Sequence, residues 1–383
     1  MNGQCEGTIP LSHPHWVKLQ PAPSHLEIAQ CAYEISGRWD VADAPLMLLA
    51  YASNIVSPWM LAVSAALQNL PLVVAGLGTL DDWRWFDGGT PKLPGSLRAV
   101  QLLNAVGSTS QVPVALVDAF DTFVANPVSS RLARSLERLG DSSVVLGGEC
   151  MHYPKCNVGE MHDKVAAYRA CIEEGLTSCA PNGGYMIGRP RAVEELLSSI
   201  LRVLVAGNGD VGPRRFTRMN DQGALHQVLI DGMRHVHARI DGASEHVLNL
   251  HPCATRQNHT AMTKGFESCR VRYSIPLSRT LVPNASAVIH WPRGSTRKAC
   301  GARDCDPPVK PLLVHANGQH ALLKHHKLAP IVNKLSAWPP PARVMAMPVL
   351  LVDAAPNRPC TVVHLKELLT MRFGNTTAPP VLI

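Results

Sequence analysis

The sequence predicts an α/β fold with a mostly parallel, doubly wound central sheet. From residue 44 onward, apolar runs of strand length alternate with runs of helix length, and Pro, Gly and Asn residues separate them. The strand-length runs are apolar throughout, which is typical of parallel strands that are covered on both faces. With 383 residues and 46% apolar content, the chain is long enough to bury the large core that such a sheet needs.

The first β-α-β unit lies between residues 46 and 78. Residues 46–51 are predicted to form a buried strand, and residues 58–67 a helix with Pro58 near its first turn. Residues 72–75 form the next predicted strand, which ends at Gly76-Leu77-Gly78. A strand, a helix and a second strand in this order open a doubly wound sheet.

The alternation continues along the chain. Further predicted elements are a helix at 96–106, a strand at 112–117, a helix at 132–139, a strand at 143–146 and a long amphipathic helix at 191–204. Both ends differ in composition, because residues 1–43 have weak periodicity and residues 301–383 are rich in Pro and His. We therefore expect one domain at 44–300, an N-terminal extension at 1–43 and a C-terminal region of unknown role at 301–383.

The composition argues against two classes of protein. The formal charge is +7, but Lys and Arg are scattered, so we expect attraction for anionic small molecules and no nucleic-acid partner. Residues 44–80 carry no charge, yet Asn54, Pro58 and the break at 68–71 divide them into pieces too short to cross a membrane. We expect no integral membrane span, and a membrane-anchored interaction protein that uses this segment is a weaker alternative.

The cysteines and sequons suggest the lumen of the secretory pathway. The 11 cysteines include no CxxC pair, which disfavours a zinc module. N-glycosylation sequons begin at Asn258, Asn284 and Asn375, and together with the cysteines they fit a protein of the endoplasmic reticulum or Golgi whose thiols pair. Sequons also arise by chance. Residues 1–16 show no signal-peptide pattern.

Two carboxylates follow the predicted strand at 112–117. Asp118 and Asp121 lie where open α/β sheets bind their ligands, at the carboxyl end of a strand. Two carboxylates three residues apart can hold Mg²⁺ or Mn²⁺ and leave positions open for substrate phosphate oxygens. The alternative is an ordinary loop or helix cap, because D-x-x-D is common in both.

Several short motifs occur in a defined order along residues 45–300. They are Gly76-Leu77-Gly78, Trp83, Gly88-Gly89-Thr90-Pro91-Lys92, Leu116 to Asp121, Gly148 to Pro154, Asn182 to Gly188, Asn220-Asp221-Gln222, and Val288-Ile289-His290 with Gly294 and Lys298. This series resembles the glycosyltransferase domain of the procollagen lysyl hydroxylase and collagen glycosyltransferase family. The corresponding family segments include Asp-x-Tyr/Phe-Asp, Ala-Glu-x-x-Cys-Trp-Pro, Asn-Ser-Gly-Gly-x-Ile-Gly, Asp-Asp-Gln and a closing His-Gly-Asn-Gly-x-x-Lys.

The resemblance implies a GT-A type Rossmann-like glycosyltransferase fold and transfer of a hexose from a UDP-sugar to an acceptor hydroxyl. The acceptor would be a protein or glycan, and the family points to hydroxylysine of a collagen-like chain. The implied metal ligands are Asp118, Asp121 and His290, with Mn²⁺ or Mg²⁺ as the cofactor. An imidazole suits Mn²⁺ better than Mg²⁺. The alternative for His290 is a partly exposed histidine at a strand end.

The resemblance also implies a donor site. Its UDP-sugar-binding positions would be Tyr51, Ser53, Trp83, Lys92, Gly294 and Lys298. The two lysines would supply positive charge, Lys298 toward the diphosphate, although isolated lysines are usually solvated. Core packing is the alternative for Trp83.

Three residues are candidates for catalysis. Asp221 matches the second Asp of the family's acidic pair and would be the carboxylate near the reacting sugar, with a helix N-cap as its alternative. Glu149 would assist it, and Asn182 precedes two glycines that let backbone approach a sugar, unless they form an ordinary turn. Asn220 replaces the family's first Asp. A non-catalytic nucleotide-sugar or glycan-binding protein on the same fold is therefore the alternative function.

Overall fold

The structure is a computed structural model of the whole chain. It describes residues 22–39, 41–52, 58–77, 92–119, 121–149, 158–176, 178–206, 221–233, 235–249, 272–274, 288–290, 310–315, 340–355 and 358–373. Within these ranges no helix is both long enough and apolar enough to cross a membrane.

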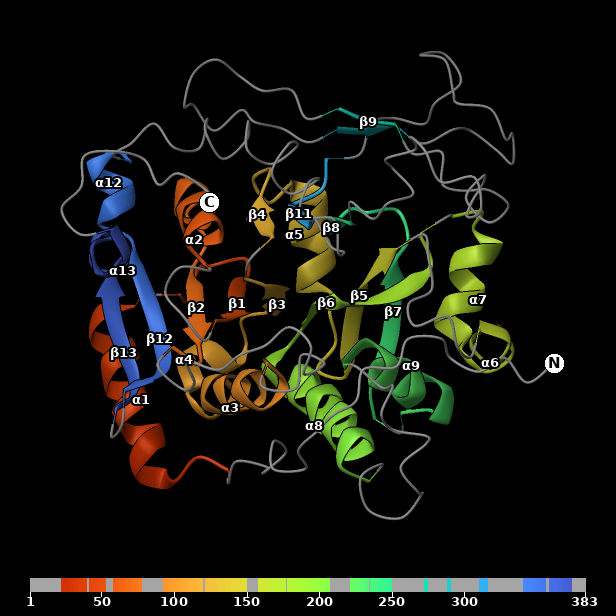
Figure 1. Cartoon of the computed structure of the whole chain (residues 1–383), viewed down its shortest axis with the longest axis horizontal. Helices are drawn as coiled ribbons and strands as arrows, with labels where there is room; N and C mark the ends of the chain where they lie inside the picture. The colour runs from red at the N-terminus through yellow and green to blue at the C-terminus, as the bar shows by residue number, and fades with distance from the viewer. Residues whose placement is uncertain are drawn as a thin grey trace.

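A mostly parallel sheet forms the centre of the molecule (Figure 1). Its strands, in spatial order, are β13 (Arg358–His364), β12 (Pro348–Ala355), β2 (Leu72–Ala75), β1 (Met47–Tyr51), β3 (Val114–Asp118), β6 (Ala180–Gly188), β5 (Ser143–Glu149) and β7 (His237–Asp241). Strands β12, β2, β1 and β3 are parallel neighbours, and so are β5 and β7. Strand β6 runs antiparallel to its neighbours β3 and β5, and β13 runs antiparallel to β12. The predicted fold class, α/β with a mostly parallel central sheet, is confirmed.

Helices cover both faces of this sheet (Figure 1). One apolar cluster contains α2 (Trp59–Leu67), α5 (Ser130–Glu137), α12 (Ala342–Met345) and α13 (Leu365–Phe373). The other contains α1 (His25–Arg38), α3 (Lys92–Ala105), α6 (Val158–Lys164), α7 (Ala166–Glu173), α8 (Pro190–Ala206) and α9 (Asp221–Asp231), and the short α4 (Gly107–Ser110) adjoins α3. Along β1, Leu48 and Ala50 belong to the first cluster, whereas Met47 and Leu49 belong to the second. Burial on both faces explains why the strands are apolar throughout.

A small second sheet lies beside the carboxyl end of β3. Its strands are β4 (Thr122–Val124), β11 (Leu313–His315) and β8 (Val247–Asn249), with β11 in the middle, antiparallel to β4 and parallel to β8. A separate antiparallel pair consists of β9 (Arg272–Ser274) and β10 (Val288–His290). Because β4 follows β3 after a short turn, the small sheet brings β11 from late in the sequence next to the end of β3.

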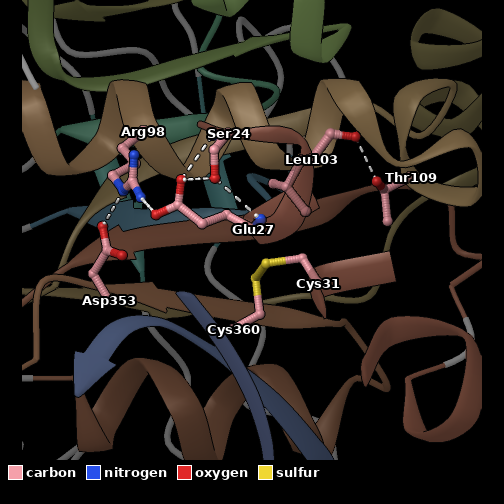
Figure 2. The surroundings of a disulfide bond; sticks show 8 residues. All are labelled: Ser24, Glu27, Cys31, Arg98, Leu103, Thr109, Asp353 and Cys360. Atoms are coloured by element: carbon pink, nitrogen blue, oxygen red, sulfur yellow. Dashed lines mark hydrogen bonds and ion pairs between the residues drawn. A yellow bond between two sulfur atoms is a disulfide. The ribbon is translucent and has the colours of Figure 1, made fainter. Parts of the chain in front are cut away.

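A disulfide and a group of ion pairs join the two ends of the described chain (Figure 2). Cys31 of α1 is bonded to Cys360 of β13. On α3, Arg98 pairs with Glu27 of α1, and its Nε atom lies 2.8 Å from Oδ2 of Asp353 on β12. These bonds hold α1 and the β12/β13 edge against α3.

The predicted domain boundaries need correction. The described part of the N-terminal extension, α1, packs in the same core as the central sheet, and β12 and β13 from beyond residue 300 are strands of that sheet. The composition changes near residues 43 and 300 therefore do not mark the edges of the fold. Pairing with β2 buries the apolar run of β12, whatever the composition of the surrounding residues.

Candidate functional site

Three side chains converge at the carboxyl end of β3. Asp118 is the last residue of β3, Asp121 precedes β4, and His315 ends β11. The Nε2 atom of His315 lies 3.1 Å from Oδ2 of Asp118 and 3.4 Å from Oδ1 of Asp121. One potential ligand atom from each residue lies within 4.8 Å of the other two, so the three residues can hold a metal ion. We call Asp118, Asp121 and His315 the metal group.

The chemistry of this group fits a divalent cation. Nε2 of His315 is buried and close to both carboxylates, but it makes no well-aligned hydrogen bond among the described residues. Burial alone would lower the pKa of His315, but the charge of Asp121 and the contacts with Asp118 outweigh burial and raise the pKa to about 9. Two carboxylates and one imidazole thus face a point where positive charge is favoured, and this oxygen and nitrogen set suits Mn²⁺.

Lys92 lies next to the same group. Its Nζ contacts Oδ1 of Asp118, donates to the carbonyl oxygen of Gly183 at 3.2 Å, and lies 3.8 Å from Oδ2 of Asp221. Burial would raise the pKa of Asp118, but the Lys92 charge and the His315 contact outweigh it and hold the pKa well below its usual range. Burial would lower the pKa of Lys92, and its two carboxylate neighbours raise it instead. Lys92 is therefore a fixed positive charge at the site.

Strand β6 approaches the site through two glycines. Its pairing with β5 is irregular between Leu146 and Gly147, so that Gly183 and Gly184 leave the regular ladder. A Cβ at residue 184 would lie 2.4 Å from Cε1 of His315 and 2.6 Å from Oδ2 of Asp118. A residue without a side chain is therefore required at this position.

A buried network lies behind the two glycines. Glu149 is 2% exposed, and its carboxylate accepts from the amides of Asn182, at 3.1 Å, and Gln222. The Asn182 Oδ1 atom accepts from the backbone N–H of Gly184 at 2.7 Å, and Oε1 of Gln222 accepts from Gly183 at 3.2 Å. The network fixes the path of β6 beside the metal group.

Asp221 begins α9, and Oδ1 accepts from the backbone N–H of Gln222 at 2.9 Å. Burial raises the pKa of Asp221, and the charge of Asp118 adds to the rise, although Lys92 opposes it. The raised pKa suits a group that exchanges a proton.

The structure describes the side chains of seven of the twelve predicted site residues. The structure brings together Asp118, Asp121, Lys92, Asp221, Glu149 and Asn182 in connected contacts. Tyr51 is the register partner of Asp118, but its ring is buried against Gly76 and Gly95. Ser53, Trp83, Gly294 and Lys298 lie outside the described residues, as does the side chain of His290 on β10. These positions stay predictions.

His315, the histidine of the metal group, is not among the residues predicted from the sequence. A signal was present, because residues 315–318 read His-Ala-Asn-Gly, and this matches the family's closing His-Gly-Asn-Gly more closely than the residues after His290 do. The Pro- and His-rich composition beyond residue 300 gives this segment no clear strand pattern. Asn249, the hydrogen-bond partner of His315, was missed as well.

Comparison with known proteins gives little further information. No family model matches the chain, and no curated protein matches it. A solved structure described as the WbbM bifunctional glycosyltransferase in its apo state is similar at 11% identity and a TM-score of 0.37. The match covers 78% of this chain and 50% of that one, so the chain spans half of its length. A likeness this weak carries no argument about function.

Proposed function

We propose that this protein is a metal-dependent glycosyltransferase that moves a hexose from a UDP-sugar to an acceptor hydroxyl. The observation that carries the proposal is the convergence of Asp118, Asp121 and His315 at the carboxyl end of β3, with Lys92 beside them. This is the edge at which open α/β sheets bind nucleotides. The family resemblance of the motifs points to the same edge.

The donor diphosphate would be bound by two kinds of charge. Asp118, Asp121 and His315 would hold Mn²⁺ or Mg²⁺, which supplies positive charge for the departing nucleoside diphosphate when it is bound. Lys92 would add a second positive charge for the diphosphate, since its Nζ is held beside Asp118 by two carboxylates and the carbonyl oxygen of Gly183.

We propose that Asp221 is the carboxylate that acts on the acceptor hydroxyl. It stands 3.8 Å from Lys92, and its raised pKa suits proton exchange with an attacking hydroxyl group. The carboxylate of Glu149 is occupied by two amide donors, so we propose that Glu149 positions β6 instead of contacting the sugar. Asn182 would act in the same way through the backbone of Gly184.

We further propose a secretory-pathway location and a hydroxylysine acceptor in a collagen-like protein. The disulfides Cys31–Cys360 and Cys171–Cys179, together with the three sequons, support an oxidising compartment. The acceptor rests on the family resemblance alone. Thiol alkylation with and without reduction, followed by mass spectrometry, tests the disulfides, and a hydroxylysine-containing collagen peptide tests the acceptor.

The test of the main proposal is UDP release from a panel of UDP-hexoses, with Mn²⁺ added or chelated. The parent protein is compared with Asp121→Asn and His315→Ala. Asp163→Asn and His162→Ala are matched controls, because both side chains are exposed on α6. We expect Mn²⁺-dependent release that is lost in the site variants and kept in the controls.

Two other outcomes have definite meanings. Metal-dependent binding of the UDP-sugar without release or transfer would replace the enzyme with the non-catalytic nucleotide-sugar-binding alternative. UDP release that is unchanged by chelation and by His315→Ala would exclude the metal group from the reaction.

A further inference from the structure

The second ring nitrogen of His315 is held by Asn249. The two residues are register partners in the parallel pair β11/β8, and both are buried, at 1% and 8% exposure. Nδ1 of His315 lies 2.7 Å from Oδ1 of Asn249. The amide nitrogen of Asn249 in turn donates to the carbonyl oxygen of Gly148 at 2.8 Å. Asn249 therefore connects the metal group to β5.

These contacts determine which nitrogen of a neutral His315 carries the proton. A carbonyl oxygen can only accept, so the NH₂ group of Asn249 must face Gly148 and its Oδ1 must face the imidazole. That oxygen also can only accept, so Nδ1 of His315 must carry the hydrogen. The lone pair of the neutral ring is then on Nε2, the atom that faces Asp118 and Asp121.

We infer that Asn249 is a positioning residue for the metal site, which sets the tautomer and orientation of His315 so that Nε2 can coordinate a cation. The inference rests on the proposed function insofar as it takes Asp118, Asp121 and His315 to be metal ligands. Partners of this kind on the far side of a metal-bound histidine commonly affect metal affinity about 10- to 100-fold.

Two hydrogen bonds hold the buried side chain of Asn249. Its oxygen lies 2.7 Å from Nδ1 of His315, and its nitrogen donates to the carbonyl oxygen of Gly148 at 2.8 Å. The competing explanation is that Asn249 only ties β8 to β5 through the Gly148 carbonyl. If Asn249 positions His315, its amide oxygen matters for metal binding; if Asn249 only ties the strands together, its amide nitrogen matters.

The experiment separates the two halves of the amide. The dissociation constant of Mn²⁺ is measured on the full chain from the electron paramagnetic resonance signal of free Mn²⁺, for the parent, Asn249→Asp and Asn249→Leu. Asp keeps an acceptor for Nδ1 of His315 and loses the donor to Gly148, whereas Leu loses both. We expect Asn249→Leu to bind Mn²⁺ about 10- to 100-fold more weakly and Asn249→Asp to bind within a few-fold of the parent. Equal losses in both variants, or parent-like binding by Asn249→Leu, would overturn the inference.

A double-mutant cycle removes the effect of added charge. In a His315→Ala background, Asn249→Asp and Asn249→Leu should bind Mn²⁺ alike, because the histidine through which Asn249 acts is gone. A persistent difference would mean that the Asp charge acts directly, and it would overturn the inference. Thermal melting in chelator checks folding, and Asn249→Ala replaces the Leu variant if the latter does not fold.

The result also separates this inference from the proposed function. Mn²⁺ binding with the expected pattern but no UDP release would support Asn249 as a positioning residue and refute the enzyme. UDP release by the parent, with Mn²⁺ binding unchanged in Asn249→Leu, would support the enzyme and refute Asn249 as a positioning residue. A parent protein that binds no Mn²⁺ would refute both.

Discussion

Replacing Gly184 with Ala should disable the metal site with a single added methyl group. The new Cβ would lie 2.4 Å from Cε1 of His315, 2.6 Å from Oδ2 of Asp118 and 2.8 Å from Oδ1 of Asn182. Carbon atoms in contact normally lie about 3.5–4.0 Å apart, so the His315 ring must move by on the order of 1 Å or β6 must shift. Two of the three neighbours are proposed metal ligands.

The size of the effect follows from the tolerance of metal coordination. Hard cations bind their ligands at roughly 2.0–2.6 Å, so a displacement of about 1 Å removes a ligand from the set. Misplacement of this size in an active site costs about 100-fold. We expect the dissociation constant of Mn²⁺ to rise by about 100-fold in Gly184→Ala, and UDP release to fall by at least as much.

The assay is Mn²⁺ binding combined with thermal melting in chelator. Gly37→Ala on α1 is the matched control, because a Cβ there has no atom within 4 Å, and it should leave Mn²⁺ binding unchanged. If Gly184→Ala binds Mn²⁺ as the parent does while remaining folded, the cation does not lie between Asp118 and His315, and the site is wrong.

Three further predictions concern charge, hydrogen bonding and covalent linkage. Lys92→Met should tighten Mn²⁺ binding, because the ammonium no longer competes for Asp118. The same substitution should weaken UDP binding on the order of tenfold. Calorimetry measures both affinities, and weaker Mn²⁺ binding would contradict the prediction. Glu149→Gln should lower the free energy of unfolding by about 1–3 kcal/mol in urea titrations. The reason is that the new NH₂ group would face the amide donor of either Asn182 or Gln222. An unchanged free energy of unfolding would refute the network. Removing both Cys31 and Cys360 should cost about 2–5 kcal/mol in the same titration, more than removing the second disulfide, whose cysteines are only 8 residues apart. An equal cost for the two disulfides would contradict the last prediction.

Local sequence patterns were sufficient to predict most of the elements between residues 46 and 204. The predicted strands at 46–51, 72–75 and 112–117 correspond to β1, β2 and β3, because their apolar runs reflect burial on both faces. Likewise, α2, α5 and α8 lie within a few residues of their predicted positions. Helix and strand periodicity depends on neighbouring residues, so it can be read without knowing the tertiary contacts.

Other elements were missed for identifiable reasons. Strand β6 contains Asn182-Gly183-Gly184, which is typical of a turn. The strand continues through this segment because β5 pairs with residues 180–182 before the two glycines and with residues 186–188 after them. Helix α1 has a readable start, since Ser24 and Glu27 form a capping box, but Pro and His residues around it obscured the pattern.

By itself, the sequence determined the α/β class and the two carboxylates at the end of β3. Both depend on contiguous residues: an apolar strand followed by Asp118 and Asp121. Only the tertiary structure showed that His315 joins them. His315 reaches the site because β11 pairs with β4, and β4 lies almost 200 residues earlier in the sequence. The tertiary structure also decided the places of Asn249 and Gly184, since a cross-strand hydrogen bond and a close approach to another strand leave no periodic pattern in the sequence.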